Sequence, residues 1–135
     1  MSIEIIFKYK RFLGGLVAIS TVIILIATLY PSKTSISLNI WNYDKVGHFI
    51  MFAGWTFLVG LFRAIYKEKK PSLWKVFFLA CFYGLLIEFL QYVVPTNRSP
   101  ETLDFVADAF GALFAIFVLH FIFRTMFPSD QTHAA

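Results

Sequence analysis

The chain has 135 residues, of which 59% are hydrophobic and 15% are charged, and its mean hydropathy is +0.71. Soluble domains carry about 25% charged residues, so the composition indicates one integral membrane domain over residues 1–135. The net charge of +4 comes from basic residues beside apolar runs, where they set membrane orientation. The sequence contains no basic recognition helix, so we expect no nucleic-acid partner.

Four apolar runs are each long enough to cross about 30 Å of hydrocarbon. The predicted helices span residues 12–30, 46–66, 73–93 and 104–124. The first run follows a basic start, as in a signal peptide, but it is too long for an h-region and no small-residue cleavage site follows it. The sequence therefore predicts an all-α, four-helix transmembrane bundle with a short polar tail after residue 127.

The basic residues divide unevenly between the two sides of this bundle. One side, which holds both termini, carries nine of the twelve: Lys8, Lys10, Arg11, Arg63, Lys67, Lys69, Lys70, Lys75 and Arg124. The other side carries Lys33, Lys45 and Arg98. The positive-inside rule then predicts that both termini are cytoplasmic and that the two polar loops face outward.

Polar side chains gather at the predicted outer ends of the helices. The candidates are Asp44, Lys45, His48, Glu88, Gln91, Arg98, Asp104 and Asp108. A charged side chain at a helix centre costs about 2.5–3.5 kcal/mol on insertion, so such residues indicate a site by default. Asp104, Asp108, Gly111 and Ala115 share one helical face, which we expect to look inward. His48 shares a face with Asp44 in the same way.

Small residues predict where helices approach one another. Gly14 and Gly15 suit a close contact in the first helix, and Ala80 and Gly84 form a small-residue strip on the third. Glu88 and Gln91 continue that strip toward the outer end.

Several of the polar residues also have a purely structural interpretation. Asp44 could cap the second helix, and Thr102 or Asp104 could cap the fourth. Intramembrane charges usually pair, so Glu88 could do no more than pair with Arg98 or Lys45 inside the bundle.

The convergence of these residues in one shallow layer favours a functional cluster. As catalytic candidates for general acid–base chemistry we select Glu88, Asp104, Asp108 and His48. As ligands for a substrate head group we select Arg98, Lys45, Gln91 and Asp44. Arg98 and Lys45 would receive an anionic group, and Gln91 could instead link helices by hydrogen bonds.

A divalent metal is a weaker interpretation of the same cluster. His48, Glu88, Asp104 and Asp108 could hold one, but no HExxH or similar spacing supports it. The single cysteine, Cys81, excludes a thiolate cluster. From the sequence we expect no metal and no other cofactor.

The order of the motifs resembles the VanZ-like family of small bacterial membrane proteins over about residues 28–118. The matching pattern is Asp44-Lys45-x-x-His48, Gly84-x-x-x-Glu88-x-x-Gln91, Arg98, and Asp104-x-x-x-Asp108-x-x-Gly111-Ala112. Many members carry Asn where Asp108 stands. The resemblance implies a multi-pass protein of the bacterial cytoplasmic membrane, and the name-giving member is associated with lowered sensitivity to the glycopeptide teicoplanin.

The leading hypothesis is therefore an envelope membrane protein with an outward-facing polar site. The site would bind or modify a surface lipid or a lipid-linked wall precursor and lower teicoplanin sensitivity. The alternative is a non-enzymatic structural or interaction module whose charges only pair within the bundle. Whether any reaction is catalysed stays open, and a proton-coupled carrier is disfavoured because the cytoplasmic halves of the helices are apolar.

Overall fold

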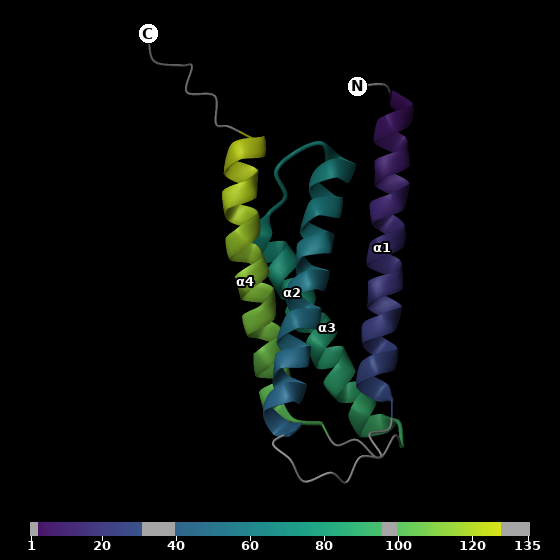
Figure 1. Ribbon diagram of the computed structural model, residues 1–135, viewed down its shortest axis with the longest axis vertical. Coiled ribbons are helices and arrows are strands. Elements are labelled where there is room, and N and C mark those ends of the chain that lie inside the picture. The colour runs from purple at the N-terminus through teal and green to yellow at the C-terminus, as the bar shows by residue number, and fades with distance from the viewer. Residues whose placement is uncertain (1–2, 31–39, 96–99, 128–135) are drawn as a thin grey trace.

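The computed structural model describes residues 3–30, 40–95 and 100–127. Side chains are described for residues 9–30, 44–95 and 100–127. These residues form four helices and no strand: α1 (Ile3–Leu29), α2 (Ile40–Lys67), α3 (Leu73–Val93) and α4 (Thr102–Met126) (Figure 1). Each helix contains a segment long and apolar enough to cross a membrane. The predicted all-α architecture of four membrane helices is confirmed.

α1 and α2 begin well before the predicted starts of their helices. α1 begins at Ile3 rather than residue 12, and α2 begins at Ile40 rather than residue 46. Asp44 therefore lies inside α2, and its interpretation as an N-cap is wrong. The polar first turns of α2 resemble a loop in the sequence, although their residues are compatible with a helix that extends beyond the hydrocarbon.

The start of α4 also differs from the prediction. Its N-cap is Glu101, whose side chain makes no capping hydrogen bond, so neither Thr102 nor Asp104 is the cap. The backbone N–H of Asp104 donates to the carbonyl of Glu101 at 2.9 Å. Asp104 stands in the first turn, where a carboxylate interacts favourably with the positive end of the helix dipole.

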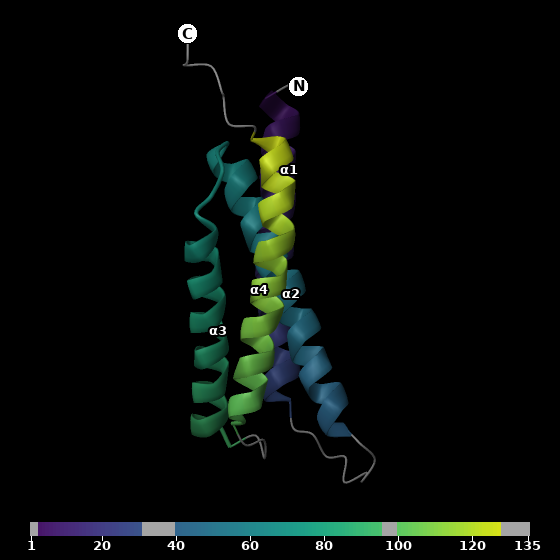
Figure 2. The ribbon, with the colours of Figure 1, turned by 90° about the vertical axis from the view of Figure 1, so that its left-hand side faces the viewer.

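The helices alternate in direction, so the first residues of α1 and the last residues of α4 lie at the same end of the bundle (Figure 1). The opposite end brings together the start of α2, the end of α3 and the start of α4. α2 crosses α4 obliquely and shares with it the largest helix–helix contact (Figure 2). We call the end opposite the termini the polar end, because Asp44, His48, Asp104 and Asp108 all lie there.

Two glycines allow α2 and α4 to approach closely. A Cβ atom on Gly111 would overlap the backbone carbonyl of Phe49, and one on Gly60 would overlap the side chain of Leu119. Interfaces between membrane helices depend on such small residues, since lipid provides no hydrophobic drive for association. The spacing and rotation of this helix pair are therefore set by backbone contact near Gly111.

The other predicted small-residue contacts hold in part. A Cβ on Gly14 would lie 3.3 Å from a ring carbon of Phe62, and one on Gly84 would lie 3.1 Å from Oδ2 of Asp108. Gly15 has nothing within 4 Å of that position, so the predicted contact is wrong there. The face of α3 that carries Gly84 thus packs against α4 at the polar end.

A cluster of three aromatic side chains fills the centre of the bundle and connects α1 to α2 and α3. The rings of Trp55 and Tyr83 stack with centroids 4.9 Å apart, and Phe52 stacks against Tyr83 at 5.7 Å. Trp55 Nε1 donates to Thr21 Oγ1 at 2.7 Å, and the Tyr83 hydroxyl donates to the Thr21 carbonyl at 2.6 Å. Each buried polar tip has a partner, so the centre is both packed and hydrogen-bonded.

Candidate functional site

One face of α4 carries the acidic residues of the polar end into the bundle. Asp104, Asp108, Gly111 and Ala115 are all buried, and Asp108 has no exposed surface. They follow the spacing i, i+4, i+7 and i+11, which keeps side chains on one side of a helix. The prediction that this face looks inward is confirmed.

His48 of α2 meets this face at Asp108. The two side chains are 1% and 0% exposed, and His48 Nδ1 lies 2.9 Å from Asp108 Oδ1. When Asp108 is ionised, its carboxylate only accepts hydrogen bonds, so Nδ1 carries the hydrogen and donates it. In the neutral ring this leaves a lone pair on Nε2. Asp108 thereby fixes both the tautomer and the orientation of the imidazole.

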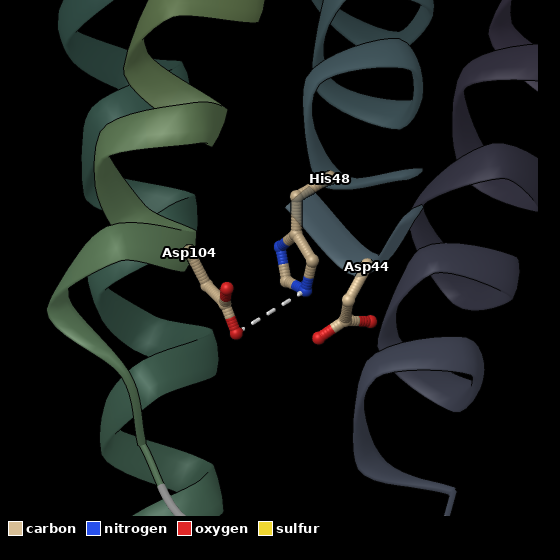
Figure 3. A group of neighbouring side chains, drawn as sticks. All are labelled: Asp44, His48 and Asp104. Carbon is tan, nitrogen blue, oxygen red and sulfur yellow. Dashed lines mark ion pairs between the residues drawn. The ribbon is translucent and has the colours of Figure 1, made fainter. Parts of the chain in front are cut away.

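The Nε2 atom of His48 faces two further carboxylates. It is buried and has no hydrogen-bond partner, and Oδ2 of Asp104 lies 3.8 Å away. Asp44, one turn before His48 on α2, brings a carboxylate oxygen to the same place, and the three candidate ligand atoms lie within 4.8 Å of one another. Figure 3 shows the imidazole directed between the two carboxylates.

Lys45 connects the same two helices at the edge of the cluster. Its Nζ lies 2.9 Å from Oδ1 of Asp104 and 3.0 Å from Oε2 of Glu101. Glu101 is a residue that sequence reasoning did not select, and it is the N-cap that precedes α4, three positions before Asp104. In this arrangement the charge of Lys45 is already engaged by two carboxylates.

Glu88 enters the cluster from α3. Its side chain is half-buried, and its Oε1 atom is buried without a hydrogen-bond partner. Asp104, Asp108 and His48 lie near enough to influence this carboxyl group electrostatically. The structure therefore brings Glu88 together with the three other predicted catalytic residues.

The remaining predicted residues are placed differently. Gln91 Nε2 donates to the backbone carbonyl of Thr28 at 3.0 Å, which links α3 to α1. That contact matches the interhelical role left open for Gln91. Arg98, the predicted anion ligand, lies outside the described residues.

The cluster as a whole is acid-rich. Five carboxylates come from Asp44, Glu88, Glu101, Asp104 and Asp108. Within the described ranges, Lys45 is the one lysine or arginine that forms an ion pair with them. Like charges in a medium of low dielectric repel strongly, so this end of the bundle favours a bound cation or shared protons over full ionisation.

An apolar groove follows the same helix pair away from the polar end. It has a volume of about 390 Å³ and lies between α2 and α4. Its lining is Phe49, Ile50, Ala53, Gly54, Phe57, Phe114, Ala115 and Val118. Phe49 is one helical turn from Lys45 and so lies on the same face of α2. The charged cluster and the apolar groove thus adjoin at this point.

The fold and the site define a multi-pass helical membrane protein with a buried, acid-rich polar end. A family model described as VanZ/LLP1 matches residues 5–124, nearly the whole chain, and the chain belongs to that family. The resemblance read from the motifs is confirmed. No curated protein and no solved structure matches the chain.

Proposed function

We propose that the polar end binds the head group of an envelope lipid or a lipid-linked wall precursor, and that the groove between α2 and α4 holds its apolar chain. The polar end faces outward from the cytoplasmic membrane of a bacterium, as the distribution of lysine and arginine predicts. Binding or modifying this lipid lowers sensitivity to teicoplanin, in keeping with the phenotype of the family's name-giving member.

The observation that carries this proposal is the position of the groove. Its first residue, Phe49, is one turn from Lys45 and directly follows His48, so a ligand in the groove ends at the charged cluster. Ligand sites combine an apolar lining with a few convergent polar groups. An amphipathic molecule that already resides in the bilayer fits this combination, because its tail and head match the two surfaces.

The cluster also contains groups suited to chemistry on a head group. Asp108 orients His48 so that Nε2 can accept a proton. Glu88 adds a second carboxyl group near His48 and Asp108. A positioned acid or base of this kind contributes about 10²–10⁴-fold to a proton-transfer step. In the proposal these groups act on the bound head group, and Asp104 and Lys45 fix the geometry around them.

One observation favours a second candidate, a structural module without a ligand. Lys45 joins α2 to α4 through Glu101 and Asp104, and His48 joins the same helices through Asp108. Ion pairs that bridge helices could serve only to fix how the bundle assembles.

Antibiotic susceptibility separates the two candidates. A teicoplanin-sensitive host expresses the wild type, Glu88→Gln, Arg98→Ala or Glu68→Gln. The last is the matched control, since Glu68 pairs with Lys10 at the opposite end. Membrane levels are compared by blot, and vancomycin is tested in parallel.

We expect the wild type and Glu68→Gln to protect against teicoplanin more than against vancomycin, and Glu88→Gln and Arg98→Ala to lose protection at equal protein level. Full protection by both Glu88→Gln and Arg98→Ala would contradict a working site. Loss of folded Glu88→Gln protein would favour the structural module.

A further inference from the structure

We propose that Asp44, His48 and Asp104 bind a divalent transition-metal ion such as Zn²⁺, and that Asp108 orients His48 for this purpose. The inference goes beyond the proposed lipid ligand and does not depend on it, because these side chains converge whether or not a head group reaches them. A bound ion would occupy Nε2 of His48, so Glu88 would then be the proton-transfer group of the proposed function. The inference also departs from the expectation drawn from the sequence, which favoured a site without metal.

The setting of His48 is the first argument. A histidine that binds a metal through one ring nitrogen almost always donates its other N–H to a carboxylate or carbonyl. Here Nδ1 donates to Asp108 at 2.9 Å, and both side chains are buried. Nε2 is left buried without a hydrogen-bond partner, and in the neutral ring it carries the lone pair. The ring is therefore prepared to bind a ligand at Nε2.

The gap between Nε2 and Asp104 is the second argument. At 3.8 Å it is too long for a hydrogen bond. In the neutral ring, an Nε2 lone pair that faces a carboxylate oxygen is unfavourable, so either a proton or a metal ion belongs between the two atoms. Zn²⁺ lies about 2.0–2.1 Å from nitrogen and about 2.0–2.2 Å from carboxylate oxygen, so a single ion spans this gap.

Asp44 completes the set with a modest adjustment. Two atoms bound to one Zn²⁺ are at most about 4.2 Å apart, twice the bond length. Tetrahedral coordination at these bond lengths places ligand atoms about 3.4 Å apart, and the three candidate atoms lie within 4.8 Å of one another, so the carboxylate of Asp44 needs to close by up to about 1.4 Å. Its half-buried position at the outer part of α2 allows that rotation.

The charges around the cluster agree with a bound cation. Lys45 pairs with Oδ1 of Asp104, which leaves Oδ2 directed at His48. Among the described residues this end of the bundle is rich in carboxylates, whose negative charge a divalent ion would offset. Three protein ligands are also the number found at zinc sites that keep a position open for water or substrate. Asp44 and His48 come from α2, whereas Asp104 comes from α4. Because the ligands are divided between two helices, no sequence motif within one helix indicates the site.

Metal binding is measured on the purified full chain in detergent. Zn²⁺ alone is added to metal-stripped protein, and its stoichiometry and affinity follow from equilibrium dialysis with elemental analysis. Co²⁺ serves as a second probe, because its absorption bands report nitrogen and oxygen ligation. The variants are Asp44→Asn, His48→Gln, Asp108→Ala and Asp108→Asn. Glu101→Gln is the control, because it removes a charge from the same end without removing a ligand.

We expect one Zn²⁺ per wild-type chain and a loss of about 100-fold or more in affinity for Asp44→Asn and His48→Gln. Asp108→Ala should lose about 10–100-fold, as is typical for a residue that orients a metal ligand, and Asp108→Asn should recover most of it. Glu101→Gln should change affinity by no more than a few-fold.

The inference is overturned if the wild type binds no Zn²⁺ above a detergent blank, or if Glu101→Gln weakens binding as much as Asp44→Asn. Size-exclusion profiles and helix content identify variants that fail to fold, and the half-buried Asp44 is the substitution most readily tolerated. Intact Zn²⁺ binding without teicoplanin protection would reject the proposed function and leave the metal site standing.

Discussion

The two ends of the α2–α4 interface hold the same helices together in different ways. Near the termini, the Leu119 side chain fits into the notch left by Gly60, and Ala64 and Phe123 are buried beside it. At the polar end the helices meet through Lys45 and His48, which pair with carboxylates of α4. Near the termini, no ion pair between described residues joins α2 to α4, and the contact is made by apolar side chains.

That difference suggests why the charges are present. Packing of small and apolar residues is the ordinary means of association in a bilayer. Buried ion pairs are a weak source of stability, and apolar replacements of the same volume are often neutral or stabilising. We therefore assign the stability of the helix pair to its apolar contacts and the charges to function. The predictions below test this division, beginning with the largest expected effect.

Leu119→Ala should destabilise the protein by about 2–5 kcal/mol, because it empties the notch at Gly60 and leaves a cavity. Unfolding in detergent, followed by loss of helix signal, measures the change. Leu113→Ala is the control, since Leu113 is 45% exposed on the same helix. Equal losses in the free energy of unfolding for the two variants would show that the contact between Leu119 and Gly60 does not stabilise the helix pair.

Gly111→Ala should destabilise by about 1–3 kcal/mol, because the new methyl group overlaps the Phe49 carbonyl and separates the helices. Gly54→Ala provides the contrast, since nothing lies within 4 Å of a Cβ there, and it should be neutral or slightly stabilising. Thermal unfolding of both variants decides the matter. A tolerated Gly111→Ala would mean that backbone contact does not set the helix spacing.

Asp108→Asn should lower stability by less than about 1 kcal/mol, because the amide oxygen still accepts the hydrogen bond from His48 and interhelical hydrogen bonds in membranes average about 0.6 kcal/mol. Asp108→Ala leaves a buried N–H unpaired and should cost about 1–3 kcal/mol. The same unfolding assay compares them. Identical losses would indicate that the charge of Asp108, rather than its acceptor, supports the fold.

Lys10→Gln should have the smallest effect, less than about 1 kcal/mol. Lys10 pairs with Glu68 at 2.9 Å, but the Glu68 side chain is 67% exposed, so solvent screens the pair. A loss comparable to that of Gly111→Ala would show that the end near the termini also depends on charge.

The sequence alone was sufficient to locate the four membrane spans and to identify the face of α4 that contributes to the site. Hydropathy located all four spans, and the spacing of Asp104 and Asp108 identified the buried face of α4. The start of α2 was missed because Asn42, Asp44 and Lys45 look like a loop when only apolar runs are counted.

Which side chains of different helices contact one another could not be predicted in the same way. Periodicity tells which residues share a face of one helix, but it does not give the rotation between two helices. That rotation depends on the contact of Gly111 with the Phe49 backbone, and it decides that His48 meets Asp108. Glu101 was overlooked for the same reason, because its role depends on where Lys45 points.

The most direct test of this account is the free energy of unfolding of the double variant His48→Leu/Asp108→Leu. Leucine branches at the same carbon as aspartate, and the substitution removes both members of the buried pair together. If the charges serve function, the double variant should be as stable as the wild type, or up to about 4 kcal/mol more stable. A loss of several kcal/mol would contradict the account and assign the polar end to the fold.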